Sequence, residues 1–151
     1  MRTTLLVIHL VGVALWLGAN GVQAFVSPRV AKAPADARLW WAHSQEHMAK
    51  VLYSVAGVAI LVTGVWMVLL ESTPWEFSDA FVSVGLAAIV IGIVLGVVVF
   101  SPGSRHVAAA IESGDEAEEK TLSNRMAAFG ILDSLIVVVT IVAMVGKWGV
   151  G

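Results

Sequence analysis

The 151-residue sequence contains no cysteine and few charged residues. The absence of cysteine excludes disulfides, cysteine nucleophiles, thiolate metal sites and cysteine-ligated iron–sulfur clusters. Charged residues make up 13% of the chain, against about 25% in soluble domains. The net charge of −2 gives no basis for expecting a nucleic-acid partner. Any metal chemistry would therefore depend on His, Asp, Glu or Met.

Long apolar runs take the place of charge, because 58% of the residues are hydrophobic and the mean hydropathy is +0.88. A helix needs about 20 residues to cross about 30 Å of hydrocarbon. Backbone groups in lipid must bond within the segment, so spanning runs of this kind are helices. The sequence predicts an all-α fold, a four-helix transmembrane bundle that forms one domain over residues 1–151. The predicted spans are residues 4–26, 49–70, 81–100 and 126–145.

The distribution of Lys and Arg predicts the orientation, since short cytoplasmic loops are enriched in both. The side opposite the two longer loops carries only Arg2 and Lys147. Both termini are therefore predicted outside, in a multi-pass protein of the bacterial cytoplasmic membrane. Ser27-Pro28 and Ser101-Pro102 are predicted to end the first and third helices. This faint repeat indicates two parallel helical hairpins. The seven cationic residues of the longer loops are Arg29, Lys32, Arg38, Lys50, Arg105, Lys120 and Arg125.

The two longer loops contain further patterns. His43 and His47 lie four residues apart in "WWAHSQEHMAKVLY", which favours a surface helix over a metal site. The stretch "HVAAAIESGDEAEEKTLSNRM" predicts a short helix that stops at Gly114, followed by an acidic run. That run is interpreted as a solvated loop, with an acidic partner-binding patch as the alternative.

Polar residues inside the spans are the best candidates for function, because polar groups in lipid normally face the bundle interior. A rise of about 1.5 Å per residue sorts them into two layers by depth. Direct pairing of His9 with Asp133 is not expected. The outer layer is predicted to hold His9, Thr63 and Thr140, and the inner layer Asp133, Asn20, Tyr53 and Ser54.

His9 has two interpretations. In the first interpretation, His9 is an axial ligand of haem b or a proton carrier. Haem iron accepts neutral imidazole, and a four-helix bundle can hold the macrocycle. Alternatively, it is a neutral histidine that donates to a threonine or a carbonyl and joins two helices. No other histidine lies inside a span, so Met67 or Met144 would be the second haem ligand.

Asp133 is either a proton or cation site or a structural carboxyl group. Asn20 is expected to be its hydrogen-bond partner, with Gln23 nearer the headgroups. Small residues recur at intervals of three or four in the third span, which favours close packing within the chain or in a homodimer. These residues are Gly85, Ala88, Gly92 and Gly96.

Several stretches resemble one bacterial family of four-span proteins that carries a domain of unknown function, the "predicted integral membrane proteins". They include "HLVGVALWLG", "SPRV", "LVTGVWMVL", "WEFSDAFVSVGL", "VLGVVVFSPGSR" and "LDSLIVVVTIVAMVGKWG". The resemblance covers nearly the whole chain and implies the same four-span fold. The first helix is also similar to copper-resistance D-type proteins and to the protoporphyrinogen oxidase membrane family, which implies that His9 has a role in haem binding.

No nucleophile–base pair, phosphate loop or interrupted transport helix occurs in the sequence. Neither catalytic residues nor a metal site are therefore predicted. The first expectation is a non-enzymatic membrane protein in contact with the bilayer, either a homo-oligomer or an accessory subunit among other membrane subunits. One alternative is a haem-binding or redox protein that uses His9 with Met67 or Met144. A second alternative is a proton- or cation-handling protein that uses Asp133.

Overall fold

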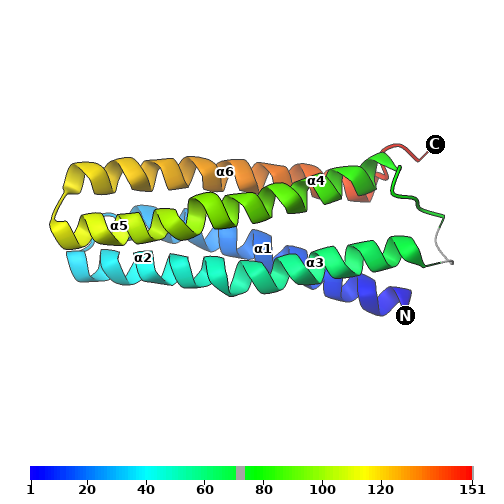
Figure 1. Ribbon diagram of the computed structural model, residues 1–151, viewed down its shortest axis with the longest axis horizontal. Coiled ribbons are helices and arrows are strands. Elements are labelled where there is room, and N and C mark those ends of the chain that lie inside the picture. The colour runs from blue at the N-terminus through cyan, green and yellow to red at the C-terminus, as the bar shows by residue number, and fades with distance from the viewer. Residues whose placement is uncertain (71–73, 151) are drawn as a thin grey trace.

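The computed structural model describes residues 1–70 and 74–150 as four helical rods packed side by side (Figure 1). This confirms the predicted all-α four-helix bundle, and no strand occurs in the described part of the chain. The first rod is α1 (Arg2–Val30), and the second joins α2 (Ala35–Lys50) to α3 (Leu52–Leu69). The third rod joins α4 (Ala80–Leu95), the π-helix η1 (Gly96–Phe100) and α5 (Ser101–Ser113), and the fourth is α6 (Glu116–Gly146).

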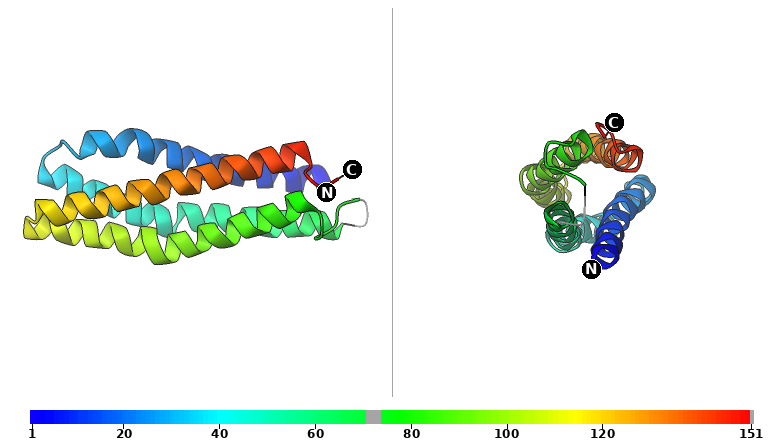
Figure 2. Two further views of the ribbon diagram at one scale, coloured as in Figure 1. Left: turned by 90° about the horizontal axis from the view of Figure 1, so that it is seen from above. Right: turned by 90° about the vertical axis from the view of Figure 1, so that its right-hand side faces the viewer.

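The rods alternate in direction around a closed ring, which Figure 2 shows along the bundle axis. α1 packs against α3, α3 against α4, α4 against α6, and α6 against α1. Both chain termini lie at one end, here called the terminal end (Figure 1). The opposite end, with the connections at residues 31–34 and 114–115, is called the loop end. The arrangement contains the two predicted hairpins, while the membrane side that each end faces stays a prediction.

All four rods are long and apolar enough to cross a membrane, with 29 to 35 residues each. The protein is therefore a multi-pass integral membrane protein whose outer surface contacts lipid. At about 1.5 Å per residue the rods are about 44–53 Å long, more than the ~30 Å hydrocarbon core. The excess length lies at the loop end, where helices continue past the predicted spans. There α2 and α5 bury a small cluster of their own, formed by Ala42, Val107, Ala108 and Ile111.

The two Ser-Pro pairs do not end helices, so that prediction was wrong. Pro28 lies inside α1, which continues to Val30, and a proline this close to a helix end disturbs few backbone bonds. Before Pro102 the rod widens into η1, and the Ser101 N–H donates to the Gly96 carbonyl five residues back. Pro102 then occupies the first turn of α5, where its missing N–H is not needed.

The prediction of a loop for the acidic run was wrong, because Glu116 and the residues after it belong to α6. Gly114 ends α5 in the left-handed conformation, with φ of 74°, which confirms the predicted stop. Asp115 caps α6 and accepts a hydrogen bond of 2.9 Å from the Glu118 N–H. The glutamates that follow form the first turn of α6, where their charges interact favourably with the helix dipole.

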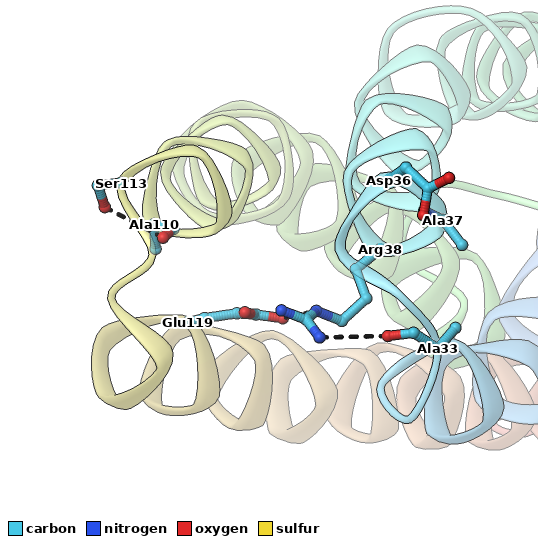
Figure 3. Close-up of polar contacts among 7 residues, drawn as sticks. All are labelled: Ala33, Asp36, Ala37, Arg38, Ala110, Ser113 and Glu119. Atoms are coloured by element: carbon cyan, nitrogen blue, oxygen red, sulfur yellow. Dashed lines mark hydrogen bonds and ion pairs between the residues drawn. The ribbon is translucent and has the colours of Figure 1, made fainter.

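An ion pair joins α2 to α6 at the loop end (Figure 3). Arg38 Nε lies 2.9 Å from Glu119 Oε1, in an ion pair rather than a well-aligned hydrogen bond. Arg38 Nη1 also donates to the Ala33 carbonyl at 3.2 Å. Both charged side chains are mostly covered, with 23% and 15% of their surface exposed. This pair therefore closes the end of the bundle between the second and fourth rods.

We expect Arg38→Gln and Glu119→Gln each to lower the free energy of unfolding by about 0.5–1 kcal/mol, the range of a partly exposed ion pair. A double-mutant cycle, with unfolding followed in detergent micelles at low and high salt, measures the coupling. The pair Lys50 and Glu46 within α2, in which the Lys50 side chain is 57% exposed, is the control and should couple more weakly. Strictly additive losses for Arg38 and Glu119 would contradict the prediction.

Candidate functional site

A buried carboxyl group forms the centre of a polar network in the middle of the bundle. Asp133 on α6 is 3% exposed. Its Oδ2 accepts hydrogen bonds from Trp16 Nε1 at 2.9 Å and from Asn20 Nδ2 at 2.7 Å, both from α1. The predicted pairing of Asn20 with Asp133 is therefore confirmed. Sequence reasoning missed Trp16, although an indole N–H in the middle of a span was a signal, because such a group needs an acceptor.

The network continues toward the loop end. Tyr53 Oη on α3 donates to Asn20 Oδ1 at 2.6 Å and accepts from Gln23 Nε2 at 2.7 Å. Gln45 on α2 then donates to Gln23 Oε1 at 3.1 Å, so Gln23 belongs to the network. Ser54 was predicted to be buried in this layer, which was wrong, because it is exposed. Successive helical residues are about 100° apart, so the inward position of Tyr53 turns Ser54 outward.

His9 joins α1 to α3. Its Nδ1 lies 3.0 Å from the Ile60 carbonyl oxygen and 3.1 Å from Thr63 Oγ1. The Thr63 hydroxyl donates to the Ala59 carbonyl, so its oxygen faces His9 as an acceptor. Because both partners accept, the proton is assigned to Nδ1, and in the neutral form of the ring Nε2 then has a free lone pair. The structural interpretation of His9 predicted such a bond to a threonine or carbonyl.

A cavity of about 280 Å³ lies between α1, α3, α4 and α6, in the half of the bundle toward the terminal end. Its lining is mainly apolar and includes His9, Met67 and Met144, the three predicted haem ligands. Asp133 lines the deep part and Lys147 the part near the terminal end. Thr140 lines it as well, and its hydroxyl bonds the Ile136 carbonyl of its own helix at 2.8 Å.

Depth along the helices places His9 and Thr140 at one level of the cavity. His9 is seven residues from Trp16, and Thr140 is seven residues from Asp133, which Trp16 contacts. Both therefore lie about 10 Å from the Trp16–Asp133 bond, toward the terminal end. This agrees with the predicted layers and keeps His9 apart from Asp133.

Glycines let three side chains that line the cavity pack closely against α3 and α4. A Cβ atom added to Gly64 would lie 3.2 Å from His9 Cε1, and one on Gly92 would lie 2.8 Å from Trp16 Cζ2. A Cβ on Gly85 would overlap Met144 Cε. Ala88, which belongs to the predicted stripe of small residues in the third span, lines the cavity. At Gly85 and Gly92 the predicted stripe of small residues therefore serves packing within the chain, whereas Gly96, which begins η1, has no atom within 4 Å of such a Cβ.

Two cations lie over the Trp75 ring at the terminal end, and of these two Lys147 lines the cavity. Lys147 Nζ is 3.9 Å from the centre of the Trp75 ring and 4.6 Å from that of Phe81. The Arg2 guanidinium carbon is 4.6 Å from the Trp75 ring centre. Burial, and next the nearby Arg2 charge, lower the pKa of Lys147 below its ordinary value. The Trp148 carbonyl accepts the Phe81 N–H at 3.0 Å, so the segment after α6 is tied to α4.

The remaining histidine pair lies elsewhere. His43 and His47 are exposed on α2, as predicted for a surface helix. No group of three or more His, Cys, Asp or Glu placed to hold a metal occurs within residues 1–70 and 74–150.

Neither a curated protein nor a solved structure shows significant similarity to the chain. The model of the family "Predicted integral membrane protein (DUF2269)" matches residues 3–148, so the chain belongs to that family.

Proposed function

We propose that this membrane protein binds haem b in the cavity, with His9 as an axial ligand. One observation carries the proposal, which is that the His9 Nδ1–H is engaged by the Ile60 carbonyl while the same side chain lines the cavity. The lone pair of Nε2 is then available, and haem iron binds neutral imidazole. A hydrogen bond from the second ring nitrogen to a carbonyl is also common among metal-bound histidines, because it fixes the ring and its tautomer.

A methionine is the second ligand in this proposal. Met144 and Met67 both line the cavity, and thioether sulfur ligates haem iron opposite histidine in some proteins. We favour Met144, because its Cε occupies the space that Gly85 leaves open. Side chains on a helix lean toward its N-terminus, which directs Met144 back toward the depth of His9. The apolar lining would contact the faces of the macrocycle.

A haem in this cavity would supply one-electron chemistry or be carried as cargo. Neither role needs a catalytic side chain, so the proposal is compatible with a non-enzymatic protein. The expectations of an accessory subunit and of a homo-oligomer stay predictions. The resemblance of the first helix to copper-resistance D-type and protoporphyrinogen oxidase membrane proteins also stays a prediction.

We expect the protein, purified in detergent and titrated with ferric protoporphyrin IX, to develop a saturable Soret band. His9→Ala should lose the band, because no other imidazole lines the cavity. Met144→Leu should keep a band but change the reduced spectrum, because only the second ligand is removed. His43→Ala, which alters an exposed histidine on α2, is the matched control and should leave the spectrum unchanged.

His9→Ala also removes the hydrogen bond by which His9 links α1 to α3, so folding needs its own check. Free imidazole added to this variant should restore the band if the chain is folded and the lost ligand was the side chain. A wild-type protein without a Soret band would contradict the proposal. An unchanged band in His9→Ala would contradict it as well.

A further inference from the structure

The two ends of the cavity carry different polar groups, with the Asp133 carboxyl group at its floor. Asp133 Oδ2 is held by Trp16 and Asn20, whereas Oδ1 has no hydrogen-bond partner among the residues that the structure describes. Oδ1 lies 3.9 Å from the position that a Cβ on Gly92 would occupy. The carboxyl group lines the cavity, so a ligand with an acidic group at its deep end would meet it at close range. An ionised pair of that kind is repulsive.

The opposite end of the cavity is cationic. Arg2 and Lys147 contact the same Trp75 ring, and no carboxylate of the described residues pairs with either cation. The two positive charges repel each other, which contributes to the lowered pKa of Lys147. An anion bound between them would relieve this repulsion and form charge-assisted hydrogen bonds.

We propose that Arg2 and Lys147 bind the carboxylate groups of the ligand, so that the cavity selects an amphiphile with an acidic end and fixes its orientation. The inference rests on the proposed function, because the two propionates of haem b supply the carboxylates. Lys147 is seven residues beyond Thr140, or about 10 Å from the depth of His9 along the bundle axis. A propionate arm and a lysine side chain can together cover that distance. The apolar edge of the macrocycle then lies toward Trp16.

The test compares ferric protoporphyrin IX with its dimethyl ester, in which both carboxylates are masked. We expect the wild-type protein to bind the free acid about five- to tenfold more tightly than the dimethyl ester. This is the gain in affinity expected from one or two partly exposed charge pairs. Lys147→Gln and Arg2→Gln should weaken binding of the free acid and leave binding of the ester unchanged. Lys147→Arg should retain the preference. Lys32→Gln, an exposed lysine near the loop end, is the control.

Binding of the ester also reports folding, since it needs His9 and the cavity but not the cations. Equal affinity of the wild-type protein for the two probes, with a band that still depends on His9, would overturn this inference and leave the proposed function standing. A preference for the free acid that persists in the double variant of Arg2 and Lys147 would overturn it too. If neither probe shows binding that depends on His9, both proposals fail.

Discussion

Replacing Asp133 by alanine is expected to lower the free energy of unfolding by about 2–4 kcal/mol. The change removes the acceptor shared by Trp16 Nε1 and Asn20 Nδ2. A buried donor left without a partner costs about 1–3 kcal/mol. Hydrogen bonds between helices in membranes average only about 0.6 kcal/mol, because the unfolded chain also finds partners there. The expected loss in the free energy of unfolding is therefore in the lower part of the range for two buried donors without an acceptor.

Unfolding in mixed micelles with increasing denaturing detergent, followed by tryptophan fluorescence, measures this loss. Asp133→Asn keeps one acceptor oxygen and should lose only about 1 kcal/mol. Ser134→Ala is the matched control on the same helix, since the Ser134 hydroxyl donates to the Gly130 carbonyl of its own helix. An Asp133→Ala protein as stable as Ser134→Ala would show that the network does not hold α1 to α6.

Gly92→Ala is expected to lower the free energy of unfolding by about 1–3 kcal/mol, the usual cost of overpacking. The new Cβ would lie 2.8 Å from Trp16 Cζ2 and 2.9 Å from Cη2. The indole ring has little room to move, because Trp16 is 7% exposed and packs against Ala56 and Ile89. Its N–H is also bound to Asp133, so any shift of the ring strains the network.

The same substitution at Gly130 provides the control, because no atom lies within 4 Å of a Cβ added there. Gly130→Ala should be neutral or stabilise the protein by up to about 1 kcal/mol, since alanine favours helix more than glycine does. Both variants are compared in the same detergent titration. Equal stabilities would mean that Trp16 adjusts freely and that the contact with α4 does not depend on glycine.

The number and type of the helices could be predicted because lipid leaves the backbone few alternatives. The helix ends could not be predicted in this way. Pro28 and Pro102 are common signals for a helix boundary, yet here one lies near a helix end and the other begins a new turn after a π-helix. A local signal of this kind does not show whether the neighbouring backbone can rearrange around the proline.

The polar layers were partly predictable, because a fixed rise per residue determines depth. Depth placed Asn20 beside Asp133 and His9 beside Thr63. It does not determine which side of a helix a residue faces, so Ser54 was assigned wrongly and Trp16 was missed. The close packing of His9 on Gly64 and of Met144 on Gly85 depends on the side of the helix that each glycine occupies, and the sequence pattern alone left that side open.

The π-helix η1 has a consequence for the evolution of the family. Gly92 and Ile111 are both buried against the bundle, and they are nineteen residues apart along the third rod. Five turns of α-helix take about eighteen residues, so η1 absorbs one extra residue. A relative that lacks one residue between Leu95 and Ser101 would present the same inward faces on an unbroken helix. This segment is therefore where we expect single-residue gaps when sequences of the family are aligned.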